Sequence, residues 1–512
     1  MRLLFAALHN GYYRNIESVV EELAGRGHDI FLGAERADSA LGGQVIVDRL
    51  TQRWPRVSAG PVARREQRTR FLATKVRFAL DYLRYLDPAY TETSGLLDRA
   101  EARTPTAILA LSRRGWLHSG AMRRRLARLL DAIDHATPPS PDIERFLDAQ
   151  RPDVVIITPL IGLIASSQID LLRSAQRRSI PTAVCVWSWD HLSSKAIIRD
   201  APDRLFVWNG VQAQEAIGMH AIPPDRVVVT GAQSFDRWFD RQPSRDRASF
   251  ATHVGLPDDR PYVLWVCSAL FPNSPSEAAF VVRWASHLRQ SPDPRLRDVR
   301  ILIRPHPSRT KEWATLDWTS VGHVALHGSN PIDEHARADY FDALYHSAAV
   351  VGLNTSAFIE AGIVGRPVLA VLPEEFRSNQ EGTLHFRYLT SADGGLLTIA
   401  RTLGEHATQL LSMLAGPPLD VLARQERFVK AFVRPHGLAV SATAIMAQGI
   451  ETIGSVESPT RRDRGSVTGR IGLRLLSALE RQPSGRRLLL DPREIEAKER
   501  RAQEEGRAVS WV

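Results

Sequence analysis

Cysteine and long apolar runs are scarce in this chain of 512 residues, and each shortage excludes a class of protein. The only two cysteines are Cys185 and Cys267, which rules out a scaffold held together by disulfides. Both lie within apolar runs and are expected to be buried thiols in a reducing compartment. The longest nearly apolar run, at 154–165, is much shorter than the roughly 20 residues that span a bilayer. No cleavable signal follows Met1, so we expect a cytoplasmic protein.

Lysine is scarce as well, and arginine supplies nearly all of the basic charge. Only five of the 66 basic residues are lysines, and the formal net charge is 66 − 57 = +9. Such a skew is more simply a bias in coding composition than an adaptation to phosphate. The arginine clusters lack interleaved aromatic residues, so nucleic acid is not an expected partner. Hydrophobic residues at 44% and charged residues at 24% are typical of a globular protein, whose length suggests roughly two to four domains.

Several common binding motifs are missing. The sequence has no Walker-type Gly-Lys-Thr/Ser, no GxGxxG fingerprint, no HExxH helix, no paired CxxC and no Asp-x-Asp pair. Without these motifs, a metal ion held together with a nucleotide has no obvious site. We therefore expect neither metal ligands nor a cofactor.

What the chain does contain is a repeated alternation of strands and helices. Residues 1–33 are predicted as strand, turn, helix and strand, residues 152–187 repeat that pattern, and a further series runs over 262–371. Such units build parallel sheets with helices on both faces. We expect an α/β protein with two doubly wound, Rossmann-like domains that face a cleft, a helical basic insertion and a charged C-terminal tail. The expected ranges are 1–240 for the first domain with its insertion at 64–136, 241–450 for the second domain, and 451–512 for the tail.

The first candidate motif is Arg304-Pro305-His306-Pro307, at the end of the predicted strand 299–304. The two prolines restrict the loop and keep Arg304 and His306 at the carboxyl end of the strand, where ligands bind in such sheets. A charged and a neutral donor at this place suit a phosphate. The alternative is a rigid exit from the strand with a surface histidine.

The second motif is Asn354-Thr355-Ser356, which leads from a predicted strand directly into a helix. Thr355 or Ser356 can cap this helix, whose first free N–H groups form an anion site. Glu360 lies one turn further along, where its carboxylate can turn back to the cleft and accept hydrogen bonds from a ribose. The alternative is a capping box with a surface glutamate. Together with the preceding motif, the segment favours recognition of phosphate and ribose.

The first domain is expected to hold the acceptor and any catalytic base. The segment 187–195 follows a strand and offers a carboxylate, an imidazole, two hydroxyls, a cation and two indole faces on which a sugar can stack. The acceptor-binding candidates are Trp187, Trp189 and Lys195, and the catalytic candidates are His9, Asp190 and His191. The alternatives are a tryptophan pair packed in the core, an Asp190 that caps the next helix, and a His9 that only stabilises a turn.

The motifs of the second domain resemble the nucleotide-binding half of GT-B-fold enzymes, in the order strand, Arg-Pro-His-Pro, helix, strand, Asn-Thr-Ser-x-x-x-Glu-Ala-x-x-x-Gly-Arg-Pro-Val. Segment 226–239 resembles the interdomain stretch of UDP-N-acetylglucosamine 2-epimerase-like and CDP-glycerol glycerophosphotransferase-like proteins. By this resemblance, Ser356 and the helix behind it would hold the donor diphosphate and Glu360 the ribose. Arg304 and His306 would flank the phosphates, and His9 occupies the place where many inverting enzymes of this fold keep their base.

The function that the resemblance implies is a metal-independent glycosyltransferase. It would move a sugar from a nucleotide-activated donor to a hydroxyl of a polysaccharide or glycolipid of the cell envelope. The alternatives are transfer of a polyol phosphate, as in the CDP-glycerol family, and a non-catalytic scaffold that binds a nucleotide-sugar. The expected partners are the nucleotide-sugar donor and a saccharide or lipid-linked acceptor, together with an anionic membrane surface.

Contact with a membrane is expected through the insertion and the tail. One basic cluster comprises Arg64, Arg65, Arg68, Arg70, Lys75 and Arg77, and another comprises Arg123, Arg124, Arg125 and Arg128. The stretch 457–512 holds 13 Lys/Arg against 9 Asp/Glu, and a short amphipathic helix is predicted over 469–479. Basic helices bind anionic membrane surfaces or lipid diphosphates, so a peripheral location at the inner face of the plasma membrane is expected. The alternative is a solvated charged face.

Overall fold

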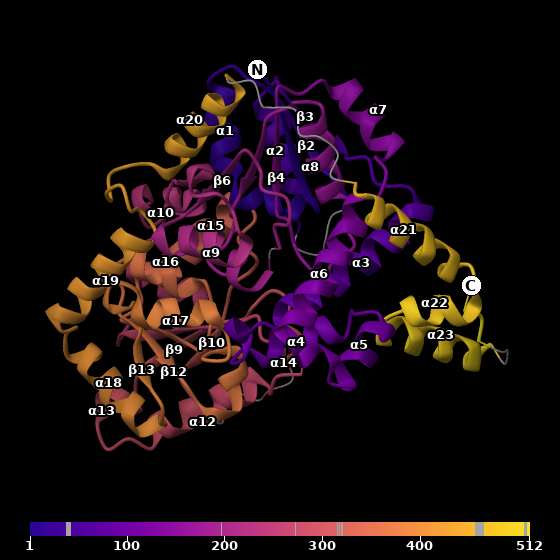
Figure 1. The fold of residues 1–512 in the computed structure, drawn as a ribbon. Coiled ribbons are helices and arrows are strands. Elements are labelled where there is room, and N and C mark those ends of the chain that lie inside the picture. The colour runs from indigo at the N-terminus through magenta and orange to yellow at the C-terminus, as the bar shows by residue number, and fades with distance from the viewer. Residues whose placement is uncertain are drawn as a thin grey trace.

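The structure is a computed structural model of the chain, and it describes residues 1–36, 42–195, 197–271, 273–314, 316, 318, 321–455, 465–505 and 509–511. Two α/β halves lie one above the other, and a layer of helices runs along one side of them (Figure 1). The N-terminus belongs to the upper half, and the C-terminus lies beside the helical layer. Of the predicted tail, residues 456–464, 506–508 and 512 lie outside the described part of the chain.

The first half is built on a parallel sheet with the strand order β3-β2-β1-β4-β5-β6-β7. Its strands are β1 (Arg2–Ala7), β2 (Asp29–Ala34), β3 (Val57–Pro61), β4 (Val154–Thr158), β5 (Thr182–Cys185), β6 (Arg204–Val207) and β7 (Val227–Val229). The order reverses between β1 and β4. The loops that follow these two strands therefore diverge and leave a crevice at the carboxyl edge of the sheet.

The second half repeats this arrangement with a parallel sheet in the order β10-β9-β8-β11-β12-β13. Its strands are β8 (Tyr262–Val266), β9 (Arg300–Arg304), β10 (Val324–Leu326), β11 (Ala349–Gly352), β12 (Val368–Val371) and β13 (Thr398–Ala400). Here the order reverses between β8 and β11, which creates the matching crevice.

The two sheets confirm the predicted α/β class with two doubly wound domains. The continuous apolar runs that predicted the central strands are buried on both faces, as in β4 and β8. The strands without a clear sequence signal, β3, β10 and β13, are edge strands and only partly buried. Their exposed face removes the apolar run that identifies a central strand.

Helices cover both faces of each sheet. In the first half they are α1 (Glu17–Gly25), α2 (Gln44–Arg53), α7 (Pro141–Gln150), α8 (Gln168–Arg177), α9 (Gly210–His220) and α10 (Asp236–Asp240). In the second half they are α11 (Arg247–Val254), α12 (Glu277–Arg289), α13 (Pro294–Arg297), α14 (Lys311–Ala314), α15 (Glu334–Tyr345), α16 (Ala357–Ile363), α17 (Leu384–Ser391), α18 (Leu403–Ala415) and α19 (Leu419–Phe432). Helix α11 lies in the connection between β7 of the first sheet and β8 of the second.

The helical layer is formed by the insertion predicted at 64–136 together with the tail helices described below. The helices of the insertion are α3 (Gln67–Tyr85), α4 (Ser94–Glu101), α5 (Thr106–Arg113) and α6 (Gly120–His135). They share a small apolar core that includes Leu83, Leu96, Leu130 and Ile133. The layer is therefore a packed unit.

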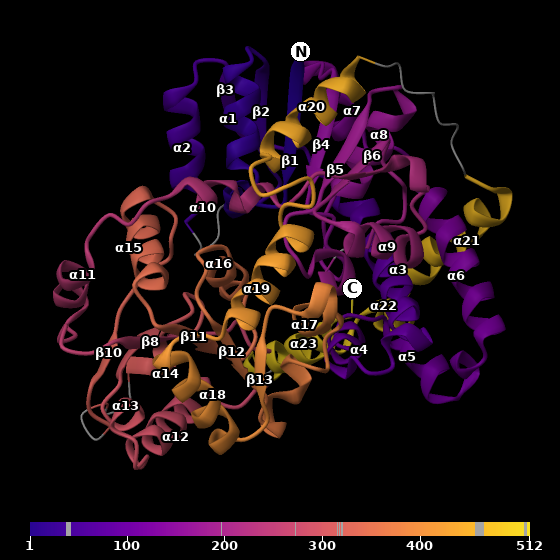
Figure 2. The ribbon, with the colours of Figure 1, turned by 90° about the vertical axis from the view of Figure 1, so that its left-hand side faces the viewer.

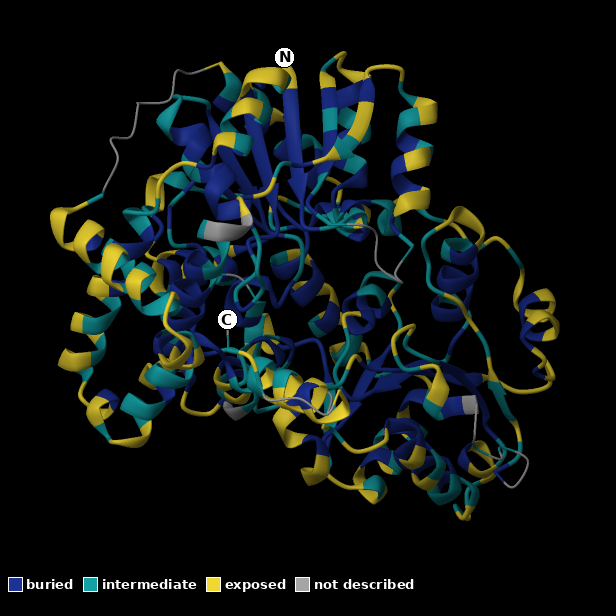
Figure 3. Ribbon diagram, turned by 90° about the vertical axis from the view of Figure 1, so that its right-hand side faces the viewer, coloured by how far each residue is buried: buried dark blue, intermediate teal, exposed yellow. Residues whose placement is uncertain are grey.

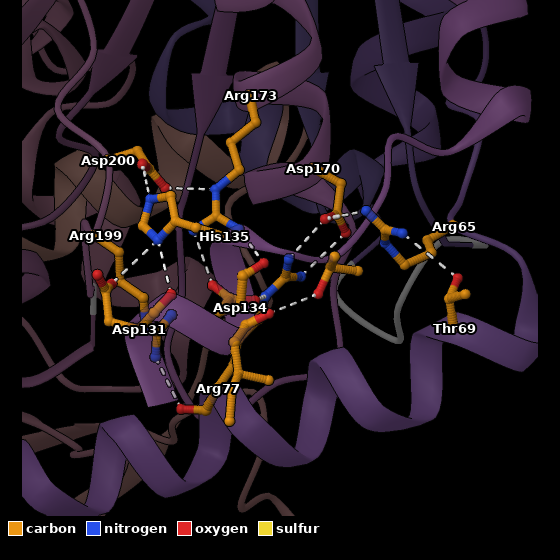
Figure 4. Close-up of polar contacts among 12 residues, drawn as sticks. Arg65, Thr69, Arg77, Asp131, Asp134, His135, Asp170, Arg173, Arg199 and Asp200 are labelled. Carbon is orange, nitrogen blue, oxygen red and sulfur yellow. Dashed lines mark hydrogen bonds and ion pairs between the residues drawn. The ribbon is translucent and has the colours of Figure 1, made fainter. Parts of the chain in front are cut away.

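The structure corrects the expectation that the first basic cluster meets a membrane, because three of its members are buried and ion-paired. Asp170 on α8 accepts hydrogen bonds from Arg65 at 2.9 Å and from Arg77 at 2.6 and 3.0 Å (Figure 4). Arg77 also donates to Asp134 on α6 at 2.8 Å, and Lys75 pairs with Asp491 at 2.9 Å. These cations fasten the helical layer to the first half and to the end of the chain.

The described part of the tail is helical and packs on the insertion. It forms α21 (Val467–Glu480), α22 (Pro483–Leu489) and α23 (Pro492–Glu504), of which α21 matches the helix predicted over 469–479. The amide of Thr106 donates to the carbonyl of Leu490 at 3.0 Å, next to the ion pair of Lys75. None of the described helices is long and apolar enough to span a bilayer.

One helix returns from the second half to the first. Helix α20 (Ala442–Gly454) lies against α1, and its Met446 and Ile450 belong to the same core as Leu3 of β1. Figure 2 shows α20 beside the upper sheet, far from the second sheet. The domain boundaries at 240 and 450 stay a prediction.

Candidate functional site

The crevices at the carboxyl edges of the two sheets open into one cleft of about 600 Å³, a size within the range of small-molecule sites. Loops that follow β1, β5, β8 and β11 line it. The cleft lining includes most of the site residues predicted from the sequence, namely His9, Trp187, Trp189, Asp190, Lys195, His306, Asn354, Thr355, Ser356 and Glu360. Two predicted residues, His191 and Arg304, are not part of the lining.

Cations outnumber acids along this lining. The six cationic side chains belong to Arg14, Arg99, Lys195, Arg237, Arg241 and Arg337, and the three acidic ones to Glu17, Asp190 and Glu360. Glu17 and Asp190 are each ion-paired with cations of the same lining. The excess of 6 − 3 = 3 positive charges in a partly enclosed cleft favours an anionic ligand.

Arg14 is the cation best placed for a ligand. It lies on the 3-10 helix Asn10–Asn15, which directly follows β1, and its side chain is exposed within the cleft. Arg14 makes no hydrogen bond or ion pair with any residue that the structure describes. Its charge nevertheless acts on Glu360 and on His306, which belong to the second half. Arg14 therefore reaches from the first half toward the groups of the second.

The loop after β11 contains two polar groups that have no hydrogen-bond partner among the described residues. Thr355 accepts the Ala357 amide at 3.3 Å, whereas the Ser356 side chain makes no capping bond and is exposed in the cleft. The side-chain oxygen of Asn354 is buried without a hydrogen-bond partner among the described residues. Ser356 and Asn354 can therefore both bond to a ligand.

Glu360 is not the surface glutamate of a capping box. The Tyr340 hydroxyl donates a hydrogen bond to its carboxylate. Burial raises the pKa of Glu360 to about 7, against the opposing influence of Tyr340, Arg14 and Arg304. Glu360 is therefore a carboxyl group that titrates near neutrality and faces the cleft.

Arg304 does not line the cleft but packs against Tyr340, the residue that bonds to Glu360. Its guanidinium lies 4.5 Å from the centroid of the Tyr340 ring and donates to the carbonyl of Ser329 at 2.7 Å. It also bonds to Asp339 at 3.4 Å, a carboxylate that the rings of His253 and His327 contact as well. Arg304 thus packs on the ring whose hydroxyl bonds to Glu360, and its charge also opposes the rise in the pKa of Glu360.

His306 is a neutral donor. Its Nδ1 accepts the backbone N–H of Ser308 at 3.2 Å, so the ring proton lies on Nε2. Burial and the charge of Arg14 lower the pKa of His306 to about 4. The ring is therefore uncharged at pH 7 and offers one N–H group.

The acceptor side of the cleft contains a buried ion pair. The Asp190 carboxylate accepts Ser188 Oγ at 2.5 Å and Lys195 Nζ at 2.8 and 3.0 Å. Burial alone would raise the pKa of Asp190, but Lys195 holds it well below its usual range. Lys195 Nζ also lies 4.7 Å from the centroid of the Trp187 ring. These contacts involve the Asp190 side chain in an ion pair and leave no helix-capping role for it.

The remaining aromatic and imidazole candidates differ in their access to the cleft. Trp189 is only 5% exposed and packs edge-on against His385, with 4.6 Å between the ring centroids. His191 is fully buried, its two ring nitrogens have no partner among the described residues, and burial lowers its pKa to about 3. The structure therefore does not bring His191 to the surface where an acceptor would bind.

His9 combines the two alternatives considered for it, because it both stabilises a turn and lines the cleft. Its Nδ1 accepts the Gly11 N–H at 3.2 Å at the start of the 3-10 helix. This bond assigns the proton of the neutral ring to Nε2. In this state His9 is a hydrogen-bond donor, whereas a general base needs a free nitrogen lone pair.

The sequence did not predict two contacts that α15 makes at the cleft. Arg337 on α15 joins the two halves by donating to Glu17 on α1 at 2.7 Å. Tyr340 on the same helix donates to Glu360 within the second half. The position of Arg14 just after the first strand was a usable signal, because loops at that place line the crevice. For Tyr340 and Arg337, which lie within a helix, the sequence carries no comparable signal.

Comparisons with known proteins bear on the fold. No family model matches the sequence, and no curated protein is significantly similar to it. A glycosyltransferase from Rickettsia africae has 10% identity and a TM-score of 0.50, with 88% of this chain and 98% of that chain covered. The UDP-GlcNAc 2-epimerase of Neisseria meningitidis, bound to UDP-GlcNAc, has 11% identity and a TM-score of 0.48 over 88% of this chain and 100% of that chain. WaaG, a glycosyltransferase of lipopolysaccharide biosynthesis, has 10% identity and a TM-score of 0.46 over 88% of this chain and 99% of that chain.

Identities at this level concern the fold alone. The likeness to the Rickettsia africae protein extends over both sheets, because 88% of this chain is covered. It agrees with the topology described above, in which two parallel sheets reverse their strand order at a shared cleft. The chain has the two-domain GT-B fold.

Proposed function

We propose that the protein is a glycosyltransferase that moves a sugar from a nucleotide-activated donor to a hydroxyl group of a saccharide or lipid-linked acceptor, without a metal ion. The observation that carries this proposal is the cationic cleft at the two switch points. Arg14 lines it from the first half and Ser356 from the second, and neither side chain has a hydrogen-bond partner among the described residues. A nucleotide-sugar has the two features that such a cleft recognises, an anionic diphosphate and a ribose.

The donor diphosphate would lie between the two halves. Arg14 would supply a charged donor from the first half, and His306 Nε2 and the Ser356 hydroxyl would supply neutral donors from the second. Preorganised donors stabilise the negative charge that develops on the leaving diphosphate. These side chains provide the neutralisation that a metal ion supplies in other enzymes.

The ribose and the acceptor would occupy opposite ends of the cleft. Glu360, positioned by Tyr340, would accept hydrogen bonds from the ribose hydroxyls. On the other side, the indole face of Trp187 and the Lys195–Asp190 pair would meet the acceptor, since sugars stack on aromatic faces.

A thermal-shift panel with UDP, CMP, CDP, GDP and dTDP in the presence of EDTA tests the donor site. One nucleotide at about one hundred times its dissociation constant should stabilise the protein by about 2.7 kcal/mol. The shift should disappear in Glu360→Ala and persist in Glu405→Ala, a matched control at a glutamate of α18 that does not line the cleft. No shift with any of the five nucleotides would contradict a nucleotide site.

Nucleotide affinity should rise as the pH increases through about 7. Below the raised pKa of about 7 the Glu360 carboxyl is largely protonated, and above it the carboxylate can accept bonds from both ribose hydroxyls. His306 stays neutral over this range because its pKa is lowered to about 4. Calorimetric titrations from roughly pH 6 to 8 would measure how nucleotide affinity changes with pH, and this dependence should be weaker in Glu360→Gln. An unchanged dependence in that variant would assign the titration to another group.

Product analysis separates this proposal from its two alternatives. A glycosidic product supports sugar transfer, whereas a phosphodiester product would establish a polyol-phosphate transferase of the CDP-glycerol type. Nucleotide-sugar binding that is lost in Glu360→Ala, with no turnover by the unmodified protein, would establish a binding scaffold.

A further inference from the structure

The helical layer has an outward face that no other described part of the chain covers. Helices α6 and α21 pack side by side at one edge of the molecule (Figure 2). Gly469 makes this approach close, because a Cβ atom there would lie 2.1 Å from the carbonyl oxygen of Ala132. The remaining sides of the two helices point away from the protein, and exposed residues run along the helices at this edge (Figure 3).

Apolar side chains form a stripe along this face. On α21, Val467, Ile471 and Leu475 are 68%, 53% and 66% exposed, and their spacing of four residues places them on one side of the helix. On α6, Met122 and Leu129 are 38% and 42% exposed. Single exposed apolar residues are common on soluble proteins, but three on one side of α21, with two more on the helix that packs against it, mark an interaction surface.

The charge beside the stripe has one sign. The exposed charged residues of the two helices are Arg124, Arg125, Arg128, Arg470 and Arg474. None of these arginines forms an ion pair with a residue that the structure describes. The acidic residues of the same helices are Asp131, Asp134 and Glu480, and each is ion-paired within the protein.

We propose that this face of α6 and α21 docks onto an anionic lipid membrane. A helix that lies in the membrane interface presents an apolar stripe to the acyl boundary and basic side chains to the lipid phosphates. Helix α21 has this composition, with Val467, Ile471 and Leu475 beside Arg470 and Arg474. The expected source of the anion is the headgroup layer of a bilayer, because only a bilayer offers negative charge and an apolar phase together.

Two other occupants fit the face less well. A second copy of the chain would bring two sets of arginines against each other, neither with an ion-pair partner among the described residues, and this is electrostatically unfavourable. Nucleic acid would satisfy the arginines, but neither helix exposes an aromatic side chain for base stacking, and the aliphatic stripe would stay in water.

The face is part of a rigid platform that also reaches the cleft. The tail is fixed by the buried pair of Lys75 with Asp491, at 2.9 Å. Helix α4 of the same layer contributes Leu96 and Arg99 to the cleft lining. Docking would therefore hold the layer that lines one side of the cleft against the lipid surface, where a lipid-linked acceptor resides. Only this last consequence rests on the proposed sugar transfer.

Vesicle co-sedimentation of the full chain tests the electrostatic part of the proposal. We expect binding to phosphatidylcholine vesicles that contain phosphatidylglycerol, weaker binding at high salt, and none to phosphatidylcholine alone. The double variant Arg470→Gln/Arg474→Gln should bind about 30-fold more weakly, since each basic side chain near the surface contributes a factor of about five to six. The control Arg283→Gln/Arg377→Gln removes two exposed arginines elsewhere and should bind normally. Equal affinity of both double variants would overturn the proposal.

Site-specific labelling tests the apolar part. The two native cysteines are buried, so Ile471→Cys can be labelled selectively with a polarity-sensitive fluorophore. Its emission should shift to the blue with anionic vesicles, whereas a label at Leu419→Cys, an 84% exposed position on α19, should not respond. An unresponsive label at 471 would overturn insertion. A dimer in solution that Leu475→Gln abolishes, without vesicle binding, would assign the face to a second copy instead. All replaced residues are exposed, and an unchanged melting curve would show that the variants fold.

Discussion

Replacing Asp170 with alanine should lower the free energy of unfolding by about 3–5 kcal/mol, because it removes the carboxylate that pairs with the buried Arg65 and leaves the buried Arg77 only its pair with Asp134 among the described residues. Arg65 and Arg77 are 5% and 7% exposed, and Asp170 is 2% exposed. Burial would raise the pKa of Asp170, but Arg77 and Arg65 hold it well below its usual range. Asp170 is therefore ionised in the folded protein. Its charge compensates Arg65, and it shares the compensation of Arg77 with Asp134.

The pH dependence of this loss identifies its cause. A carboxyl group whose pKa is lowered by folding stabilises the protein above its unfolded pKa of about 4, and the contribution fades as the pH falls toward the folded value. The difference in the free energy of unfolding between the unmodified protein and Asp170→Asn should therefore be largest near neutrality and become smaller in acid. Chemical denaturation at several pH values would measure it. Asp142→Asn, which breaks a surface pair with Arg145, is the control and should cost less than about 1 kcal/mol. An equally small effect in both variants would contradict the role of the buried network.

The same network shows where interpretation of the sequence failed. A run of arginines at 64–77 has the composition of a solvated or membrane-facing cluster. Whether such a cluster is buried depends on its partners, and Asp170 lies 93 positions from Arg77 and 105 from Arg65 along the chain. No local pattern connects residues at those separations. In contrast, Arg124, Arg125 and Arg128 are exposed, although their local sequence looks similar.

The central strands and the phosphate-side motifs were predictable because each is a local property of the sequence. Parallel strands buried on both faces appear as apolar runs, and polar residues at their carboxyl ends must line the switch points once the sheets form. This placed His306, Ser356 and Glu360 at the cleft without knowledge of the tertiary structure. Tyr340, which bonds to Glu360, could not be predicted in this way, because it lies within the separate helix α15 and meets Glu360 only in the folded protein.

Asp190→Asn should reduce kcat for sugar transfer by about 100- to 10,000-fold while leaving nucleotide binding intact. Of the predicted catalytic groups, His191 lies outside the cleft lining, and His9 Nδ1 already accepts the Gly11 amide. The Asp190 carboxylate lines the cleft, and its Oδ2 bonds only to Lys195 among the described residues. It is therefore the group best placed to take the proton of the acceptor hydroxyl.

The lowered pKa of Asp190 makes this carboxylate a weak base but a constantly ionised one. Burial opposes ionisation and Lys195 overcomes it, so Asp190 stays charged throughout the neutral range. An acceptor hydroxyl becomes acidic only as its bond to the sugar forms, and a weak base suffices at that stage. The pH profile of kcat should therefore show no step from the titration of Asp190 between roughly pH 6 and 8. Lys195→Met should introduce such a step, because it removes the cation that lowers the pKa of Asp190.

Glu215→Gln is the matched control for the test of Asp190. Glu215 is a buried carboxyl near Asp190 whose pKa burial raises to about 7, but it bonds to Tyr388 at 2.7 Å and does not line the cleft. This variant also removes a nearby carboxyl group, but it leaves the residues of the acceptor side unchanged. Its activity should therefore stay within about threefold of that of the unmodified protein. If Asp190→Asn stays active while His9→Ala loses turnover, the histidine must release its Gly11 bond on substrate binding and act as the base itself. Loss of activity in Asp190→Asn alone would exclude His9 as the base, in agreement with its Nδ1 accepting the Gly11 amide.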